Sequence, residues 1–317
     1  MLLLLEDNYH MINFRRELKK IPLVRKFLQR ISKRTEAPNR DITEMRMALV
    51  RMNHPELRQE CDYILHNLNI PDEWFIPYPI LKSFERIVSG YDRKLGLPFV
   101  VYEDKRLYFP SSYSEELCAS IFKGFMEKEC LLGGVYREKQ PHQYESDQCK
   151  VESGNTLVDV GCAEGLFTLG HIEQIEKAYL IEGNANWIPA LKATFSDFMD
   201  KVVIINKYVS NYDSDKTITL NTILPDKGDK QIFVKMDIEG GEKEVLFGNM
   251  DYLKSLSNVK MAVCTYHRQD DADLFAKLFN ELGFQYEFSD GYMYIHRSDF
   301  IPFYPYFRHG VIRAWKN

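Results

Sequence analysis

The spacing of hydrophobic residues changes along the chain at about residue 150. After that point short apolar runs alternate with stretches of helical period, which is typical of a parallel β-sheet covered by helices on both faces. The runs expected to form strands are residues 156–160, 178–182, 202–205, 232–236 and 259–264. Helices are expected between most of them, for example over 187–198 and over 272–282, where Gly283 ends the helix. The last apolar segments, 292–296 and 311–315, have no helix between them and are candidates for an antiparallel edge.

The part of the chain before residue 150 is dominated by helical patterns. Helix starts are expected at residues 41–44 and 53–56, and a further helix between Pro79 and Gly90. A β-hairpin is expected over residues 97–109. A helix should then begin near Ser112 and end near Lys128.

Length and composition are those of a globular protein with two domains. At about 150 residues per domain, 317 residues suggest two. We place them at residues 1–110, a mainly helical region that ends in the hairpin, and at residues 111–317, the α/β domain. Hydrophobic residues make up 45% of the chain and charged residues 27%, which is ordinary for a soluble protein. The 41 Lys and Arg against 46 Asp and Glu give a net charge of −5, which argues against a general nucleic-acid-binding protein.

Signals for membranes, secretion and structural metals are weak. No apolar run approaches the roughly 20 residues of a membrane-spanning helix, and the opening run Met1–Leu5 is too short for a signal peptide. The six cysteines form no CxxC pair and show no metal-like spacing with the eight histidines, so we expect neither a disulfide framework nor a zinc site. Scattered thiols suit a reducing compartment, and we therefore expect a cytoplasmic protein.

The first 40 residues are basic, with ten Lys or Arg against four Asp or Glu. Apolar residues recur every three or four positions from Phe14 to Ile31, which predicts an amphipathic helix that Pro22 interrupts. We expect its apolar side to pack on its own domain or on a partner, including a second copy of the chain. The alternative is peripheral contact with an anionic membrane surface.

A turn rich in small residues follows the first strand of the α/β domain. Asp159 lies in that strand, Gly161 allows a sharp turn, and small residues at Ala163 and Gly165 let a ligand approach the backbone. Glu182 ends the next strand, where an acidic side chain suits the two hydroxyls of a ribose. This arrangement predicts a site for an adenosine-containing ligand, although similar turns also occur for tight packing alone.

The turn favours one adenosine ligand over another. A dinucleotide fingerprint read from Gly161 needs glycines at positions that hold Ala163 and Leu166. Asp159 and Glu164 flank the turn, and their negative charge suits the ammonium and sulfonium groups of S-adenosylmethionine better than a pyrophosphate. We therefore expect S-adenosylmethionine as the cofactor.

Three segments make the interpretation more specific. They are Leu157–Gly165, Ile181–Asn184, and the K-x-D-x-E-G-x-E pattern of Lys235–Glu242 followed by Val245–Gly248. Together they resemble the FkbM family of class I S-adenosylmethionine-dependent methyltransferases, over about residues 150–317. The resemblance implies an α/β, Rossmann-like, mostly parallel sheet with helices on both faces. It does not extend to the first 110 residues.

The resemblance also implies the cofactor-binding positions. The methionine part of the cofactor would be held by the turn after the first strand, the ribose by an acid after the second strand, and the adenine edge by the segment after the third strand. The implied residues are Asp159, Gly161, Ala163, Gly165, Glu182 and Ser210. At Ala163 this chain departs from many class I enzymes, which have glycine there.

The implied catalytic residues follow the fourth and fifth strands. Asp237, Glu239 and Glu242 would lie beside the transferred methyl group, and His267 follows Cys264 where many relatives carry a glutamate ahead of the histidine. A hydroxyl acceptor needs a general base, and both His267 and Asp237 are candidates. We expect repulsion from Glu239 to raise the pKa of Asp237.

These residues also have plainer interpretations. Glu239 and Glu242 would then only cap the helix that begins near Gly240, and His267 would be an ordinary loop histidine. A third interpretation makes Asp237, Glu239 and His267 ligands of a divalent cation. The spacing does not force all three inward, so we expect no metal.

The sequence thus predicts a methyltransferase that acts on a hydroxyl of a sugar, a glycan or another small-molecule acceptor. The nature of the acceptor comes from the resemblance only. An NAD(P)-dependent oxidoreductase on a similar sheet is one alternative, and the missing glycines count against it. A non-catalytic scaffold with a vestigial cofactor site is the other.

Overall fold

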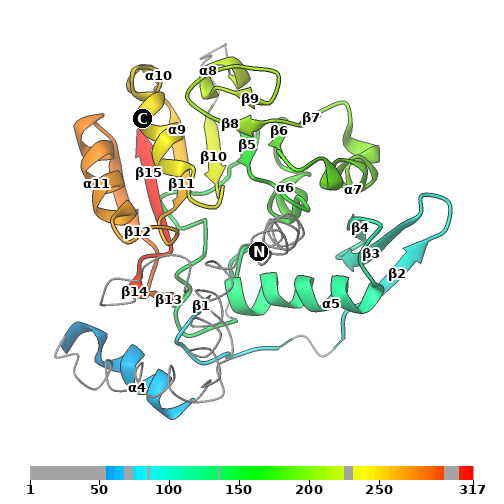
Figure 1. Ribbon diagram of the computed structural model, residues 1–317, viewed down its shortest axis with the longest axis horizontal. Helices are drawn as coiled ribbons and strands as arrows, with labels where there is room; N and C mark the ends of the chain where they lie inside the picture. Colours follow the sequence, from blue (N-terminus) through cyan, green and yellow to red (C-terminus); the bar gives the residue numbers. More distant parts are fainter. Residues whose placement is uncertain are drawn as a thin grey trace, which may run out of the picture. The chain divides into compact units, whose positions relative to one another are not determined.

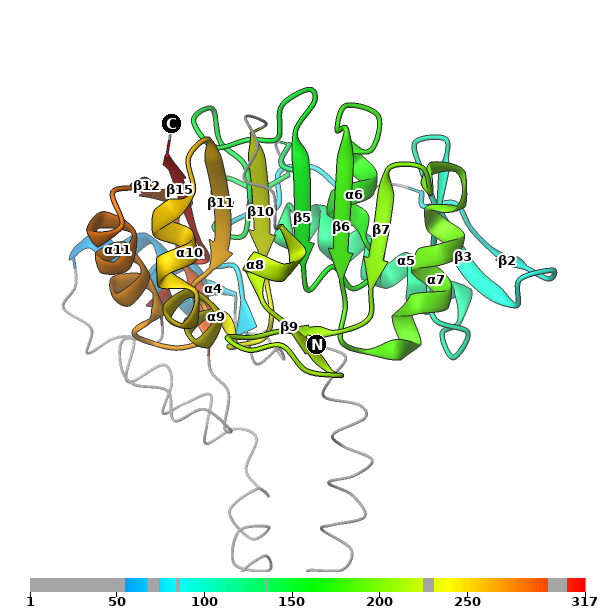
Figure 2. The same cartoon turned by 90° about the horizontal axis from the view of Figure 1, so that it is seen from above.

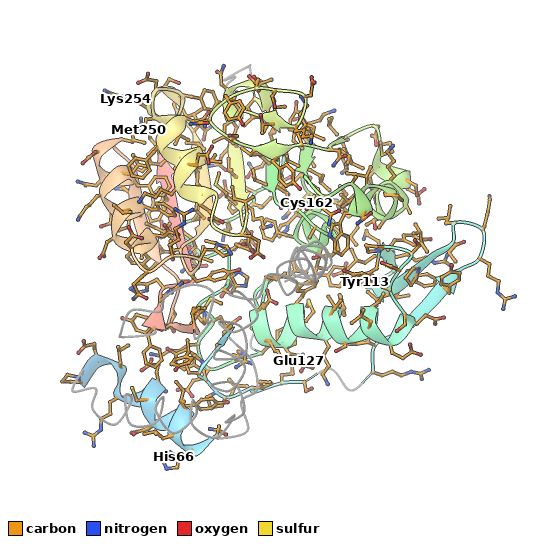
Figure 3. The ribbon with its side chains drawn as sticks, viewed as in Figure 1. His66, Tyr113, Glu127, Cys162, Met250 and Lys254 are labelled. Atoms are coloured by element: carbon orange, nitrogen blue, oxygen red, sulfur yellow. The ribbon has the colours of Figure 1, made fainter. Side chains whose placement is uncertain are left out.

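A computed structural model describes residues 55–67, 74–83, 86–134, 136–224, 231–295 and 307–316. The chain forms two compact units, Met1–Leu68 and Asn69–Asn317. In the first unit a short 3-10 helix, Pro55–Leu57, leads into α4, Arg58–His66, which confirms the helix start predicted at 53–56. His66 is the last residue of α4 (Figure 3). The helices predicted for Phe14–Ile31 and from residue 41 lie outside the described residues.

A mixed, mainly parallel sheet of seven strands forms the centre of the second unit. Its order is β12-β15-β11-β10-β5-β6-β7 (Figure 2). The bounds are β5 Thr156–Val160, β6 Lys177–Ile181, β7 Val202–Ile205, β10 Ile232–Met236, β11 Val259–Cys264, β12 Gln285–Phe288 and β15 Val311–Lys316. All five predicted strands are confirmed, and they run parallel to one another. The Rossmann-like sheet expected from the sequence is therefore present.

The last strand of the chain does not form the expected edge. β15 is inserted between β11 and β12 and is antiparallel to both. Residues 311–314 are fully buried, as suits an inner strand. The other segment of the predicted pair, β13 (Met293–Ile295), joins β1 (Trp74–Phe75) and β14 (Phe307–Arg308) in a separate three-stranded sheet.

Helices cover both faces of the seven-stranded sheet, as expected. Alternate strand residues such as Val158 and Met261 form one core with helix residues that include Leu246 and Phe275. The helices on this face are α8 Leu220–Ile223, α9 Glu242–Gly248, α10 Met250–Ser255 and α11 Asp271–Glu281 (Figures 1 and 2). The opposite face bears Phe233, whose ring lies 5.9 Å from that of Phe167.

Shorter elements complete the second unit. Phe167 belongs to α6, Leu166–His171, which lies on this opposite face. The next helix, α7 (Ile188–Thr194), is flanked by the 3-10 turns Ala185–Trp187 and Ser196–Phe198. The predicted helix over 187–198 is thus present with a 3-10 turn at each end. A small parallel pair, β8 Tyr208–Val209 and β9 Thr217–Ile218, follows β7.

The described residues between Pro79 and Gly90 form no helix, so the helix predicted there is wrong. Ile80 pairs antiparallel with Arg137, and the backbone N–H of Leu81 donates to the carbonyl of Tyr136 at 2.7 Å. These distant partners take the hydrogen-bonding groups that a helix would have used. The described residues 81–83 and 86–88 have no regular secondary structure, and a strand begins at Ser89.

The predicted hairpin is present as part of a three-stranded sheet. Its strands are β2 Ser89–Asp92, β3 Leu97–Tyr102 and β4 Lys105–Tyr108. The next helix, α5 (Glu115–Lys123), begins after Ser114, whose side chain accepts a hydrogen bond from the backbone N–H of Leu117, and continues as a π-helix, Gly124–Glu129. The described N-terminal part therefore holds α4 and a small sheet rather than several helices. The predicted domain boundary near residue 110 stays a prediction, since the compact units divide after Leu68.

Two further observations concern membrane spans and the cysteines. Among the described residues, no helix is long and apolar enough to span a membrane. All six cysteines are free and buried.

Candidate active site

The predicted site residues gather at the carboxyl ends of four parallel strands. Gly161 follows β5, Glu182 follows β6, Asp237 follows β10, and His267 lies three residues beyond β11. Strand pairing brings these ends to the same edge of the sheet, because Asp159 pairs with Lys235 on one side and with Leu180 on the other. Ligands of open α/β sheets bind at this edge.

The turn after β5 needs glycine at its first position. Gly161 has φ +73°, and a Cβ atom there would lie 2.0 Å from the carbonyl oxygen of Asp237. The turn thus packs directly against the end of β10. The N–H groups of Gly161 and Cys162 both donate to the carbonyl of Ile181, at 2.9 and 3.2 Å. Cys162 marks this turn in Figure 3.

Glu182 is linked to the same turn. One carboxylate oxygen accepts a hydrogen bond from the backbone N–H of Ala163 at 3.0 Å, and the other accepts from Asn184 at 2.7 Å. Ala163 adopts the left-handed region, with φ +45°, which directs its N–H toward Glu182. Burial raises the pKa of Glu182. Each oxygen keeps a further lone pair, so this half-buried carboxylate can accept hydrogen bonds from vicinal hydroxyls.

Asp159 does not face the turn. It is fully buried, accepts a hydrogen bond from the Thr168 hydroxyl at 2.8 Å, and forms an ion pair with Lys235 at 3.1 Å. The Lys235 ammonium also donates to the carbonyl of Gly161 at 2.8 Å. From their strands, β5 and β10, Asp159 and Lys235 therefore fix the position of the turn.

Neither Asp159 nor Glu164 gives the turn the net negative charge that was expected from the sequence. Lys235, which is paired with Asp159 across the sheet, neutralises the carboxylate of Asp159. Burial raises the pKa of Glu164 to about 8, which keeps its carboxyl mainly neutral at pH 7. Electrostatic attraction by these two residues is thus no argument for a cationic ligand.

The remaining predicted cofactor residues occupy different places. Gly165 precedes α6 with φ +82° and packs against Phe195. Ser210 follows β8 and is buried, and its hydroxyl donates to Glu244 at 3.0 Å. This contact ties the end of β8 to α9.

Asp237 is the centre of a polar cluster that we call the Asp237 cluster: Asp237, His142, Tyr144, Tyr266 and His267. Its Oδ2 accepts a hydrogen bond from Tyr144 at 2.9 Å and lies 3.5 Å from His142 Nε2. Its Oδ1 accepts from Tyr266 at 3.3 Å and lies 3.5 Å from His267 Nε2. Each carboxylate oxygen is thus matched by one tyrosine and one histidine.

The second ring nitrogen of each histidine, Nδ1, contacts a further carboxylate. His142 Nδ1 lies 3.1 Å from Glu129, and His267 Nδ1 lies 3.1 Å from the fully buried Glu242. Burial would lower the pKa of His142, but Asp237 and Glu129 raise it to about 9. Burial would also lower the pKa of His267, but Glu242 and Asp237 outweigh burial and raise this pKa. Both rings are therefore oriented with Nε2 toward Asp237.

The expected rise in the pKa of Asp237 is wrong. Burial would raise this pKa, but the hydrogen bond from His142 and the positive charges of His267 and Lys235 outweigh burial and hold it well below its ordinary range. Glu239, the residue expected to raise it, lies 3.6 Å from His267 Nε2 with a side chain 42% exposed. Asp237 is consequently a weak base.

Neither Glu239 nor Glu242 is shown to cap α9, whose N-cap residue is Gly241. Glu242 begins α9, and its Oε1 accepts the backbone N–H of Ile238 at 2.7 Å while facing His267. Glu242 thus joins the segment before α9 to the site. Glu239 precedes the helix with φ +56°.

Sequence reasoning missed Glu129, His142, Tyr144 and Tyr266. Three of them precede the first strand of the sheet, in a segment without regular hydrophobic spacing. The signal available there is the His142-x-Tyr144 pair, which the fold brings to Asp237.

Comparison with known proteins agrees with this arrangement. A family model described as the methyltransferase FkbM domain matches residues 124–289, just over half of the chain. The match begins earlier than the predicted resemblance and includes Glu129, His142 and Tyr144, while residues 290–317 lie beyond it. No curated protein matches the chain.

Solved structures are similar only at a distance. A precorrin-6y C5,15-methyltransferase from Geobacter metallireducens is 13% identical, with 54% of this chain and 83% of that chain covered and a TM-score of 0.36. A precorrin 8w decarboxylase from Methanobacterium thermoautotrophicum is 16% identical, covering 52% and 83%, with a TM-score of 0.35. An rRNA methylase from Streptococcus thermophilus is 12% identical, covering 52% and 89%, with a TM-score of 0.35.

The family match decides between the cofactors considered from the sequence. It sets the nicotinamide alternative aside and implies S-adenosylmethionine as the methyl donor. The chain belongs to the FkbM family of methyltransferases.

Proposed function

We propose that this methyltransferase acts on a hydroxyl group of a small-molecule or glycan acceptor. The observation that supports the proposal is the Asp237 cluster, which sets two oriented imidazoles beside one carboxylate at the ligand-binding edge of the sheet. A hydroxyl is a poor nucleophile until its proton is removed, whereas an amine presents a free lone pair. A site built to accept and stabilise a proton therefore favours a hydroxyl acceptor.

The turn after β5 and the end of β6 fit the methyl donor. Glu182 offers partly exposed oxygens to the ribose hydroxyls, and the backbone of Gly161, Ala163 and Gly165 would border the methionine part. Ser210, held against α9, would border the adenine. When bound, S-adenosylmethionine supplies a methyl group on a sulfonium, which is a good leaving group. Asp159 is a positioning residue here, since it acts on the turn through Lys235.

His267 is the proposed general base. In its neutral form, Nε2 accepts the acceptor's proton, and Glu242 and Asp237 stabilise the imidazolium that results. The low pKa of Asp237 makes that carboxylate the weaker candidate. Glu239 has the most exposed side chain of the three acids near His267, so it would contact the acceptor where the site meets solvent.

Transfer of a radiolabelled methyl group to sugars, glycans and small alcohols, with amines as comparison, tests the proposal. We expect transfer to at least one class of hydroxyl, and a loss of about 10²–10⁴-fold in turnover for His267→Gln with cofactor affinity kept. His66→Gln, which changes an exposed histidine of α4, is the matched control. Transfer to amines alone, or full activity of His267→Gln, would contradict the proposal.

A further inference from the structure

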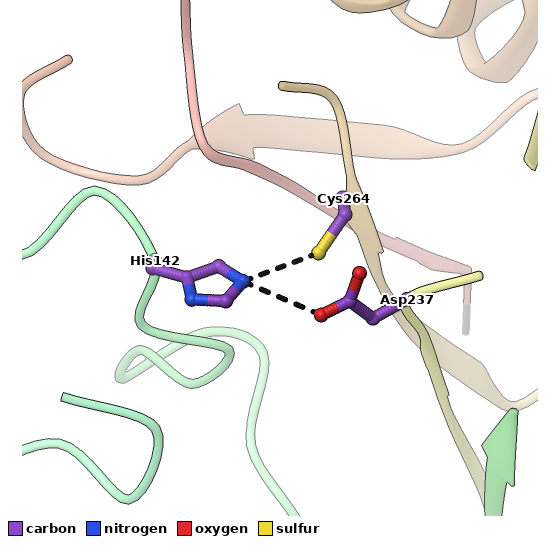
Figure 4. A group of neighbouring side chains, drawn as sticks. All are labelled: His142, Asp237 and Cys264. Atoms are coloured by element: carbon purple, nitrogen blue, oxygen red, sulfur yellow. Dashed lines mark hydrogen bonds and ion pairs between the residues drawn. The ribbon is translucent and has the colours of Figure 1, made fainter. Parts of the chain in front are cut away.

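His142, Asp237 and Cys264 bring three different donor atoms close together. His142 Nε2 lies 3.5 Å from Asp237 Oδ2 and 3.5 Å from the sulfur of Cys264 (Figure 4). One ligand atom of each residue lies within 4.8 Å of the other two. They come from the segment before β5, the end of β10 and the end of β11, so the fold alone brings them together.

The two distances from His142 Nε2 to its neighbours match those between the ligands of a tetrahedral metal centre. Zinc binds nitrogen and oxygen at about 2.0–2.2 Å and thiolate sulfur at about 2.3 Å, so tetrahedral angles place the donors about 3.3–3.6 Å apart. Both contacts of His142 Nε2 have that length.

The surroundings hold the ligands as metal sites do. Glu129 lies 3.1 Å from Nδ1 of His142, the arrangement that fixes the tautomer of a metal-binding histidine and directs Nε2 to the ion. Tyr144 donates to Asp237 Oδ2 at 2.9 Å and so orients the carboxylate. His142 is 2% exposed and Cys264 is fully buried, which keeps bulk water from two of the three ligands.

A second group near Asp237 is less suitable. Asp237, Glu242 and His267 also offer atoms within 4.8 Å of one another. However, Asp237 contacts Nε2 of His267 whereas Glu242 contacts Nδ1, on the other side of the ring. Glu242 also accepts the backbone N–H of Ile238. Glu242 therefore orients His267, and the group with Cys264 is the better metal site.

We propose that His142, Asp237 and Cys264 bind one zinc-class divalent ion and leave a fourth coordination position for the acceptor hydroxyl. Nitrogen, oxygen and sulfur ligands together suit zinc better than magnesium or calcium. At pH 7 binding releases two protons to solvent, one from the Cys264 thiol and one from His142 Nε2, because the ligands are the thiolate and the neutral imidazole. The role in the reaction rests on the proposed function: the ion would polarise the hydroxyl, and its proton would pass to His267 on the other oxygen of Asp237.

Metal binding is tested first without any acceptor. Chelator-treated full-length protein is titrated with Zn²⁺, and with Co²⁺ as a spectroscopic probe. We expect one ion per chain and a near-ultraviolet thiolate-to-cobalt band. Cys264→Ser should lose this band and weaken Zn²⁺ binding more than 100-fold, and Glu129→Gln should weaken it about 10–100-fold. Cys118→Ser, a buried cysteine of α5, is the control and should keep both.

The outcomes separate the site from its role. No retained ion, or a cobalt spectrum unchanged in Cys264→Ser, overturns the site even if hydroxyl methylation is observed. If Cys264→Ser fails to fold, the thiolate-to-cobalt band of the wild-type protein decides, and its absence overturns the site. A bound ion whose removal leaves hydroxyl methylation unchanged overturns the role in the reaction, whereas loss of methylation on chelation and its recovery with Zn²⁺ supports it.

Discussion

The ammonium of Lys235 lies 3.1 Å from the carboxylate of Asp159 on the neighbouring strand, and both side chains are almost completely buried. The same ammonium donates to the carbonyl of Gly161, so one lysine fixes the turn against two strands. This pair explains why a charged residue occurs in the otherwise apolar strand β10. A substitution of Lys235 or Asp159 would therefore disturb the turn although neither residue contacts a ligand.

Removing either partner of this pair leaves a buried charge without compensation. We expect Lys235→Met to lower the free energy of unfolding by about 3–5 kcal/mol. In the double variant with Asp159→Asn the loss should be smaller than the sum of the two single losses. Urea unfolding measures both, and additive losses would show that the two groups do not interact in the folded protein.

Gly161 is expected to tolerate no side chain. In Gly161→Ala the new Cβ would lie 2.0 Å from the Asp237 carbonyl, and the residue would also occupy the left-handed region. The control is Gly154→Ala, because Gly154 has φ +81° with nothing within 4 Å of its Cβ position. The control should lose about 1–2 kcal/mol in unfolding experiments, and Gly161→Ala clearly more. Equal losses would mean that the turn does not pack on β10.

Glu182 is expected to determine cofactor affinity. Glu182→Ala should weaken binding of S-adenosylmethionine by about 1–3 kcal/mol through the loss of charged hydrogen bonds. Isothermal calorimetry measures this for the cofactor and for its demethylated product, with NAD as a ligand that should not bind. Glu281→Gln, at the exposed end of α11, serves as the control. Unchanged affinity in Glu182→Ala would remove this residue from the site.

Asp271 is expected to make stability depend on pH. Burial and the nearby Glu242 raise the pKa of Asp271 to about 7, against about 4 in the unfolded chain. The folded protein therefore binds more protons between these values, so this group's contribution to stability falls as the pH rises from about 4 to about 7.

The corresponding measurement compares wild type with Asp271→Asn in urea at pH 5 and pH 8. The variant keeps an acceptor for the backbone N–H of Arg268, which Asp271 now binds at 3.2 Å. We expect the variant to gain stability relative to wild type as the pH rises, by at most about 1.4 kcal/mol per pH unit within the window. A constant difference between the two proteins across this range would show that Asp271 keeps an ordinary pKa.

The strands of the sheet were predictable because inner parallel strands are buried on both faces and therefore appear as continuous apolar runs. β10 was recognised despite Lys235, since its other residues, such as Phe233, are apolar. The segment from Pro79 to Gly90 was not predictable in this way. Its backbone partners are near Tyr136, more than 50 positions away, and local patterns carry no information about them.

The residues of the candidate site also divide into those that local sequence patterns predict and those that they do not. Gly161 and Glu182 were found because the turn and the next strand end lie at a regular spacing in sequence. His142 was not, because its partner Cys264 is 122 positions away. The pKa of Asp237 was misjudged for the same reason, since the groups that lower it come mainly from other segments.

Asp237 uses one oxygen for each histidine, and this arrangement has a genetic consequence. Replacing one imidazole changes the charge and the orientation of the carboxylate that the other imidazole needs. The effect of a substitution at His142 should therefore depend on which residue occupies position 267, and the reverse. Selection would then constrain the residues at the two positions jointly, although they are 125 positions apart in the sequence.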